Sequence, residues 1–137
     1  MGTLRGEIDP QVRLGDHYIS QHDIPKAIVC LRQALTQLTL DVNQKDLYLR
    51  LNALTVSAKL ALQMKQSIHA VELLGFVEGE LVKGPHEIWA FDRNRHGQSK
   101  EKARDALNEN EFQEAWQDGF GMTMEQALAL ALEVMDR

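Results

Sequence analysis

Residues 13–35 read RLGDHYISQHDIPKAIVCLRQAL and contain two amphipathic helical patterns separated by a short polar turn. The first pattern has an apolar stripe at helical spacing. Its members are Val12, Leu14, Tyr18 and Ile19. The second pattern begins at Ile24-Pro25, where a proline is tolerated because an N–H in the first helical turn has no partner, and Asp23 is a suitable cap. The stretch therefore predicts a hairpin of two antiparallel helices.

The order of small and large residues in this hairpin resembles the tetratricopeptide repeat, a helical hairpin that stacks into a superhelix. The matching residues are Leu14, Gly15, Tyr18, Ala27, Leu31 and Ala34, whereas Gln11 and Thr39 depart from the pattern. Gly15 is expected to let the second helix approach the first closely, with Ala27 as the small residue that it meets. Tyr18 and Leu31 are expected to fill the gap between successive hairpins.

A more degenerate second hairpin is predicted at residues 46–82. When Ala70 is aligned with Ala27, Ala58 occupies the position of Gly15. Positions 27 and 70 are 43 apart, whereas the usual period of this repeat is about 34 residues. A longer connecting loop or extended helices would account for the difference.

The C-terminal part of the chain, residues 85–137, is also expected to be helical. Gly97 costs a helix about 1 kcal/mol relative to alanine, so we expect a kink or two shorter helices near it. A short helix should follow, with Asn108 or Asn110 as its cap and Gly119 as the left-handed residue that ends it.

The last helix is predicted to begin at Thr123, because Thr123 and Gln126 have the spacing of a capping box. Its apolar residues form a broad stripe. They are Met124, Ala127, Leu128, Ala131, Leu132 and Met135. A helix with so broad an apolar face must be packed against other helices.

The segment from Ala70 to Glu133 resembles the extreme C-terminus of large bacterial signalling proteins, which carry an ATPase module of the STAND class followed by helical repeats. The residues that carry the resemblance are Leu73, Leu74, Gly75, Phe91, Phe112, Ala115, Trp116, Gly119, Met122, Glu125 and Ala127. The resemblance implies a C-terminal piece of a larger regulator, or a small relative of one, whose final helix packs on the preceding hairpin and closes the superhelix. Gly97 departs from this family, in which that region is usually continuous helix.

These patterns together predict an all-α fold of six or seven helices in a single domain. We expect tetratricopeptide-like antiparallel hairpins, forming an α-α superhelix, with C-terminal capping helices. The first repeat is assigned to residues 10–40, the degenerate second repeat to 46–82 and the capping helices to 85–137, within one domain of residues 1–137.

The net charge of −5 argues against direct nucleic-acid binding by this chain. The locally basic segment 91–105 is interrupted by Asp92, Glu101 and Asp105 and lacks the interleaved aromatic residues of single-strand binders. No continuous apolar run reaches the roughly 20 residues of a membrane span, so no membrane association is expected. One cysteine, Cys30, suits a reducing compartment, and a cytoplasmic location is expected.

The sequence contains no pattern for catalysis, for a metal or for a cofactor. The five histidines include no His-x-x-x-His pair and have no spaced cysteine partners. Cys30 lies on the inward-leaning stripe of its helix, where cysteine is usually a small apolar residue. No nucleophile elbow or phosphate-binding loop is present. We therefore expect a protein that is not an enzyme.

A binding surface is the remaining functional expectation, since the first helix of each stacked hairpin lines the concave side of a superhelix. The expected contact residues are Arg13, Asp16, Ser20, Asn52, Lys59 and Gln63, with Val12, Ile19, Thr55 and Val56 on the same face. Arg13 and Lys59 would pair with carboxylates of an extended peptide or a helix.

Three hypotheses follow. The main one is a non-catalytic helical-repeat module that binds a protein or peptide, or other domains of a larger regulator, and relays a signal in a bacterial transcriptional or signalling regulator. The second is a homodimer that self-associates through the apolar last helix at Leu128, Leu132 and Met135. The third is a sensor with an enclosed pocket for a small effector near Trp89 or Trp116.

Overall fold

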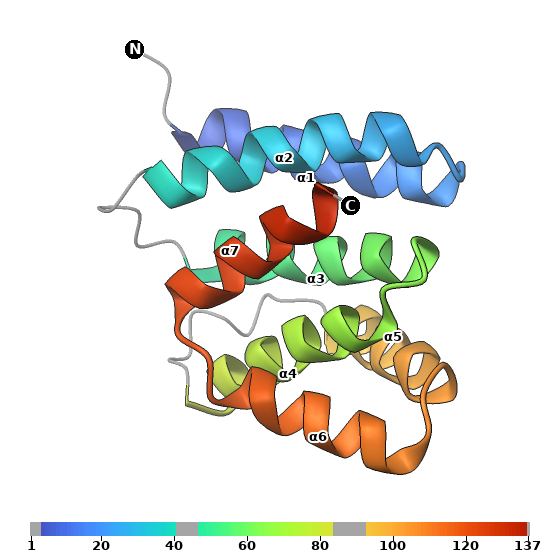
Figure 1. Cartoon of the computed structure of the whole chain (residues 1–137). Coiled ribbons are helices and arrows are strands. Elements are labelled where there is room, and N and C mark those ends of the chain that lie inside the picture. Colours follow the sequence, from blue (N-terminus) through green and yellow to red (C-terminus); the bar gives the residue numbers. More distant parts are fainter. Residues whose placement is uncertain (1–3, 41–46, 84–92, 137) are drawn as a thin grey trace.

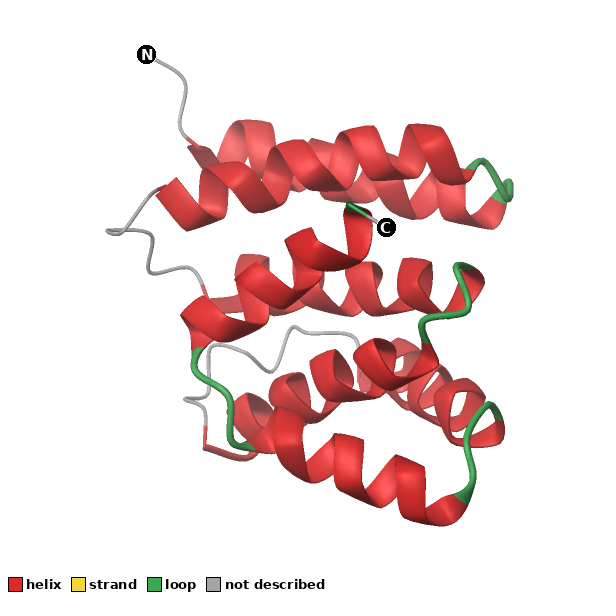
Figure 2. Ribbon diagram, in the orientation of Figure 1, coloured by secondary structure: helices red, strands yellow, loops and turns green. Residues whose placement is uncertain are grey.

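The computed structural model of this protein describes residues 4–40, 47–83 and 93–136. The described residues form seven helices and no strand, which confirms the all-α class for this part of the chain (Figures 1 and 2). The helices are α1 (Leu4–Ser20), α2 (Ile24–Leu40), α3 (Leu47–Gln63), α4 (Ser67–Lys83), α5 (Arg93–Asp105), α6 (Glu109–Phe120) and α7 (Met124–Met135).

The first four helices form two hairpins of identical layout. Each helix has 17 residues, and the hairpins α1–α2 and α3–α4 begin at Leu4 and Leu47, 43 positions apart. Their turns also match: His22 and Lys65 have positive φ angles of 59° and 65°. In both turns the next residue donates its N–H to a carbonyl five residues earlier, as in a Schellman motif. The two hairpins thus repeat in both helix bounds and turn geometry.

Gly15 lets α1 and α2 pack closely, but its nearest neighbour differs from the expected one. A Cβ on Gly15 would lie 2.8 Å from Cγ of Leu31, which is fully buried. Leu31 therefore packs against Gly15 inside the first hairpin, where its side chain extends over the space that glycine leaves on α1.

Helix α3 is the centre of the fold. It packs against α1, α2, α4, α5 and α7. Between Leu51 and Leu60 every residue is buried except Asn52 and Lys59, which are partly buried. Leucine, alanine and valine occur on all sides of this helix, and a helix of that composition is stable only when other helices surround it.

Helix α7 packs on α2, α3 and α4, and Figure 1 shows it crossing α3 between α2 and α4. The sequence implied contact with the preceding hairpin, whereas α7 contacts both hairpins. Its C-terminal carbonyls are capped by other helices: Arg32 Nη2 donates to Met135 O at 2.9 Å, and Gln66 Nε2 donates to Val134 O at 3.1 Å. These side chains satisfy carbonyl groups that the end of a helix leaves unpaired.

Two glycines let α4 and α6 pack backbone against backbone. A Cβ on Gly75 would lie 2.6 Å from the backbone oxygen of Trp116, and a Cβ on Gly119 would overlap the backbone carbonyl of Glu72. Gly119 lies inside α6, and no glycine among the described residues has a positive φ. The expectation that Gly119 ends its helix in the left-handed conformation is therefore wrong, because this glycine permits close approach to α4.

Helix α5 is one helix across Gly97, where the sequence predicted a kink or a break. A single glycine costs about 1 kcal/mol, which the docking of the helix offsets. Polar groups provide much of this docking. His96 Nε2 lies 3.0 Å from Glu78 Oε1 of α4, and Lys100 Nζ lies 4.3 Å from the ring centroid of Trp116 on α6.

The N-terminal caps of α6 and α7 agree with the sequence. The Asn108 side chain accepts from Glu111 N at 2.8 Å, so Asn108 rather than Asn110 is the cap of α6. The Thr123 hydroxyl accepts from Gln126 N at 3.1 Å, and the Gln126 side chain accepts from Thr123 N in return. The predicted capping box of the last helix is confirmed.

Alanine at two helical glycines should change stability in opposite directions. Gly97→Ala should raise the free energy of unfolding by about 1 kcal/mol, because a Cβ there meets nothing within 4 Å. Gly119→Ala should lower it by about 3 kcal/mol, because α6 must move away from Glu72. Urea unfolding followed by circular dichroism measures both changes. A destabilising Gly97→Ala or a neutral Gly119→Ala would contradict this packing.

Candidate binding site on the inner face

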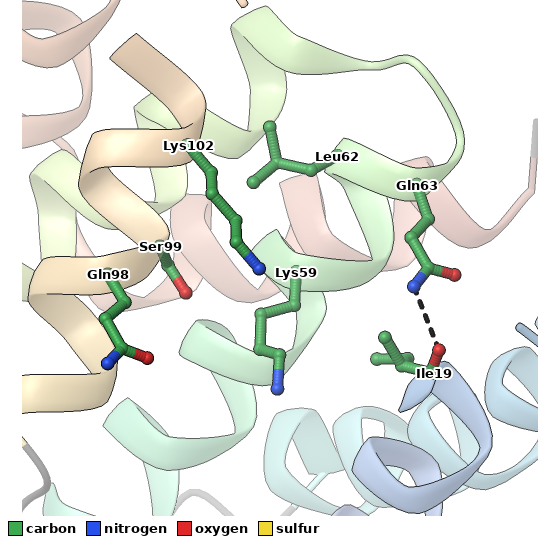
Figure 3. A pocket seen from close by; sticks show the side chains of 7 residues that line it. All are labelled: Ile19, Lys59, Leu62, Gln63, Gln98, Ser99 and Lys102. Carbon is green, nitrogen blue, oxygen red and sulfur yellow. Dashed lines mark hydrogen bonds between the residues drawn. The ribbon is translucent and has the colours of Figure 1, made fainter. Parts of the chain in front are cut away.

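Helices α1, α3 and α5 converge on a small cavity of about 150 Å3, which we call the inner-face cavity (Figure 3). Helix α3 packs on both α1 and α5 and connects the two sides of the cavity. The cavity is lined by Ile19 of α1, by Lys59, Leu62 and Gln63 of α3, and by Gln98, Ser99 and Lys102 of α5.

Two ammonium groups reach this cavity from different helices. Figure 3 shows Lys59 of α3 and Lys102 of α5 extending into the space between their helices. Lys59 Nζ forms a salt bridge with Asp16 of α1, and these side chains are 28% and 21% exposed. Lys102 has no ion-pair partner among the described residues. Two positive charges and one negative charge make the site locally cationic, although the chain as a whole carries −5.

Ser99 adds a hydroxyl to the cavity wall, and the residue is 5% exposed. Gln63 Oε1, from another lining residue, is buried and has no hydrogen-bond partner among the described residues. A buried polar group without a partner costs about 1–3 kcal/mol. The Gln98 amide lies on the same wall, and Ile19 and Leu62 supply apolar surface. The two lysines and Ser99 therefore favour a small ligand group that accepts hydrogen bonds, and Gln63 Oε1 adds one acceptor to the lining.

Two side-chain contacts fix the α1–α3 wall of the cavity. Gln63 Nε2 donates to the Ile19 carbonyl at 2.9 Å, which pairs a carbonyl near the end of α1. The Asp16–Lys59 salt bridge joins the same two helices about one turn earlier. Of the six contact residues expected from the sequence, Lys59 and Gln63 therefore line the cavity, and Asp16 contacts Lys59.

The other three expected contact residues lie apart from the cavity lining. Arg13 is exposed and forms a salt bridge with Asp9 of its own helix at 3.2 Å. Ser20 is exposed and donates its hydroxyl to a carbonyl of α1 at 2.6 Å. Asn52 is partly buried on α3. Four residues expected on the same face are buried, because α1 and α3 are covered by other helices there. They are Val12, Ile19, Thr55 and Val56.

The α5 wall was missed at the sequence level. Gly97 predicted a break at this point, so the segment was assigned to capping helices without a binding role. The spacing of these residues could have indicated the wall. Ser99 lies three positions before Lys102 and Gln98 lies four positions before it, so all three share one helical face.

The residues expected at a homodimer interface lie on α7, which packs against other helices of the same chain. Leu128 and Met135 are each 3% exposed, and Leu132 is partly buried. Packing of α7 on its own chain therefore already covers two of these three side chains.

Trp116, one of the two tryptophans near which an effector pocket was expected, stacks on Phe112 with ring centroids 5.5 Å apart. Trp89 lies outside the described residues, as does Phe91 of the family resemblance. A larger and mainly apolar cavity of about 430 Å3 lies between α2, α3 and α7.

A metal site, a membrane-spanning helix or a reactive thiol in the described part of the chain would indicate another function. No three His, Cys, Asp or Glu side chains there are grouped to hold a metal ion, and none of the described helices is both long and apolar enough to cross a bilayer. Cys30 is buried, and burial raises the pKa of its thiol. A raised pKa lowers the thiolate fraction and makes Cys30 a poor nucleophile.

Comparison with known proteins gives no relative for this chain. No family model matches it, and neither the curated proteins nor the solved structures contain a significant match. The resemblance to tetratricopeptide repeats and to the C-termini of STAND-class regulators thus stays a prediction from the sequence.

Cys30 should react slowly with iodoacetamide in the folded protein at pH 8, since both burial and the raised pKa of its thiol oppose attack. The same thiol should react quickly in urea. Mass spectrometry of samples taken over time measures both rates. Equal rates with and without urea would contradict the buried position of Cys30.

Proposed function

We propose that this chain is a non-catalytic helical-repeat module that binds a protein or peptide partner through its inner face. The inner-face cavity is the observation that carries the proposal, because it joins side chains from three helices distant in sequence. Its two lysines, serine hydroxyl and glutamine amides are suited to holding a polar group.

The size of the cavity suits an anchoring group better than a whole small molecule. Its volume of about 150 Å3 is below the roughly 300–1,000 Å3 of a typical small-molecule site. A partner would place one side chain or a chain terminus in the cavity and lay adjoining residues along the exposed polar surface of α1, where Arg13 and Ser20 are accessible. A small contact of this kind gives weak and reversible binding, which suits signal relay.

The sequence resemblance supports a place for this binding in a bacterial transcriptional or signalling regulator of the cytoplasm. The partner would be another domain of such a regulator or a separate protein. The ATPase module of these regulators is not among the 137 residues of this chain, so the role proposed for it is recognition and relay.

Selection from a random peptide library displayed on phage tests this proposal. The wild-type chain should enrich a recurrent peptide sequence. Synthetic peptides of that sequence should bind a Lys59→Ala, Lys102→Ala variant about a hundredfold more weakly, because each of the two lost charge-assisted hydrogen bonds contributes about 1.5 kcal/mol or more. Fluorescence anisotropy measures the affinities.

The matched control is a Lys26→Ala, Lys83→Ala variant, which removes the same charge from exposed positions that do not line the cavity. It should bind the peptides with unchanged affinity, and circular dichroism should show both variants folded. Peptides that bind the two variants equally well, or repeated selections without enrichment, would overturn the proposal.

A further inference from the structure

We infer that the inner-face cavity is a carboxylate-binding subsite, which takes the carboxylate of an acidic side chain or of a peptide C-terminus. This inference rests on the proposed function and names the group that the partner supplies. The occupant follows from charge, hydrogen-bond capacity and volume, all of which the lining residues define.

The α5 wall presents donors that match a carboxylate. Lys102 and Ser99 are one helical turn apart, and Figure 3 shows the ammonium and the hydroxyl extending from the same side of α5. Within the described residues Lys102 has no ion-pair partner, and Ser99 is 5% exposed. A carboxylate has two oxygens that accept several hydrogen bonds, so it can pair with both donors at once.

The α3 wall already holds a carboxylate, that of Asp16, against Lys59. This salt bridge is an internal example of the contact that we infer for the ligand, formed where both side chains are mostly buried. Asp16 also reduces the positive charge of the cavity, so it competes with an incoming anion for Lys59. Lys59, Lys102 and Asp16 together carry the charge of one cation. This charge matches a ligand group that carries one negative charge.

Volume restricts the occupant further. A cavity of about 150 Å3 has space for about five water molecules at roughly 30 Å3 each. A carboxylate with one or two methylene groups occupies a similar volume, and Ile19 and Leu62 offer apolar contact to the methylenes. Glutamate, aspartate and a C-terminal residue all meet this description.

Chemical-shift titration of the 15N-labelled full chain distinguishes these sources. The probes are acetyl-glutamic acid amide for a side-chain carboxylate, acetylglycine for a C-terminal carboxylate and acetyl-glutamine amide as the neutral isostere. One or both carboxylates should give saturable shifts of the backbone amides of Lys59, Gln63 and Ser99, and the tighter one identifies the source. The neutral probe should give none.

Two variants should change this affinity in opposite directions. Lys102→Gln should weaken carboxylate binding about tenfold, because it replaces a charged donor by a neutral one. Asp16→Asn should strengthen it by several-fold, because it removes the competing carboxylate and leaves Lys59 to the ligand. Lys26→Gln, an equal change of charge at an exposed site outside the cavity, should leave it unchanged.

The inference is overturned if neither carboxylate gives saturable shifts, if acetyl-glutamine amide binds equally well, or if Lys102→Gln has no effect. Its failure is distinguishable from failure of the proposed function. Selected peptides that require the cavity lysines, together with no carboxylate binding, would overturn this inference alone. Carboxylate binding without any selected peptide would overturn the proposed function alone.

Discussion

A helix that is apolar around its whole circumference is stable in water only when other helices surround it, and α3 is such a helix. The two hairpins supply three neighbours, α1, α2 and α4. The remaining sides are covered by α7, which crosses between α2 and α4, and by α5. Elements of the same chain thus cover α3, and the inner-face cavity lies where α1, α3 and α5 contribute side chains to one space.

The two covering helices differ in character, and the candidate site follows from that difference. Helix α7 is rich in leucine and alanine and contributes to the core. Helix α5 has Ala103 as its only residue in the core and is held by polar contacts, including Arg104 over the Phe112 ring at 4.7 Å. A polar helix laid against α3 brings Ser99 and Lys102 into a partly enclosed space. The same arrangement that covers α3 thus creates a cavity lined with hydrogen-bond donors.

Much of this fold could be predicted from the sequence, because its signals are local. Period, proline position and capping residues specify α2, α6 and α7, and the 43-residue offset specifies the second hairpin. The errors concern Gly97 and Gly119, whose roles depend on what lies opposite: empty space at Gly97 and the backbone of α4 at Gly119. Of the expected contact residues, Lys59 and Gln63 line the cavity, because helical register places them on one face of α3. The α5 wall was missed because no local signal shows which face of a polar helix docks.

The central claim is that α7 completes the core of its own chain, and one pair of variants tests it most directly. Ala131 is fully buried on α7 and Ala129 is exposed on the same helix. The free energy of unfolding and the molar mass of Ala131→Glu and Ala129→Glu should be measured over a wide concentration range. We predict that Ala131→Glu loses about 3 kcal/mol or more at every concentration, whereas Ala129→Glu loses almost none. A folded, monomeric Ala131→Glu derived from an oligomeric wild type would contradict the account and make α7 an interface between chains.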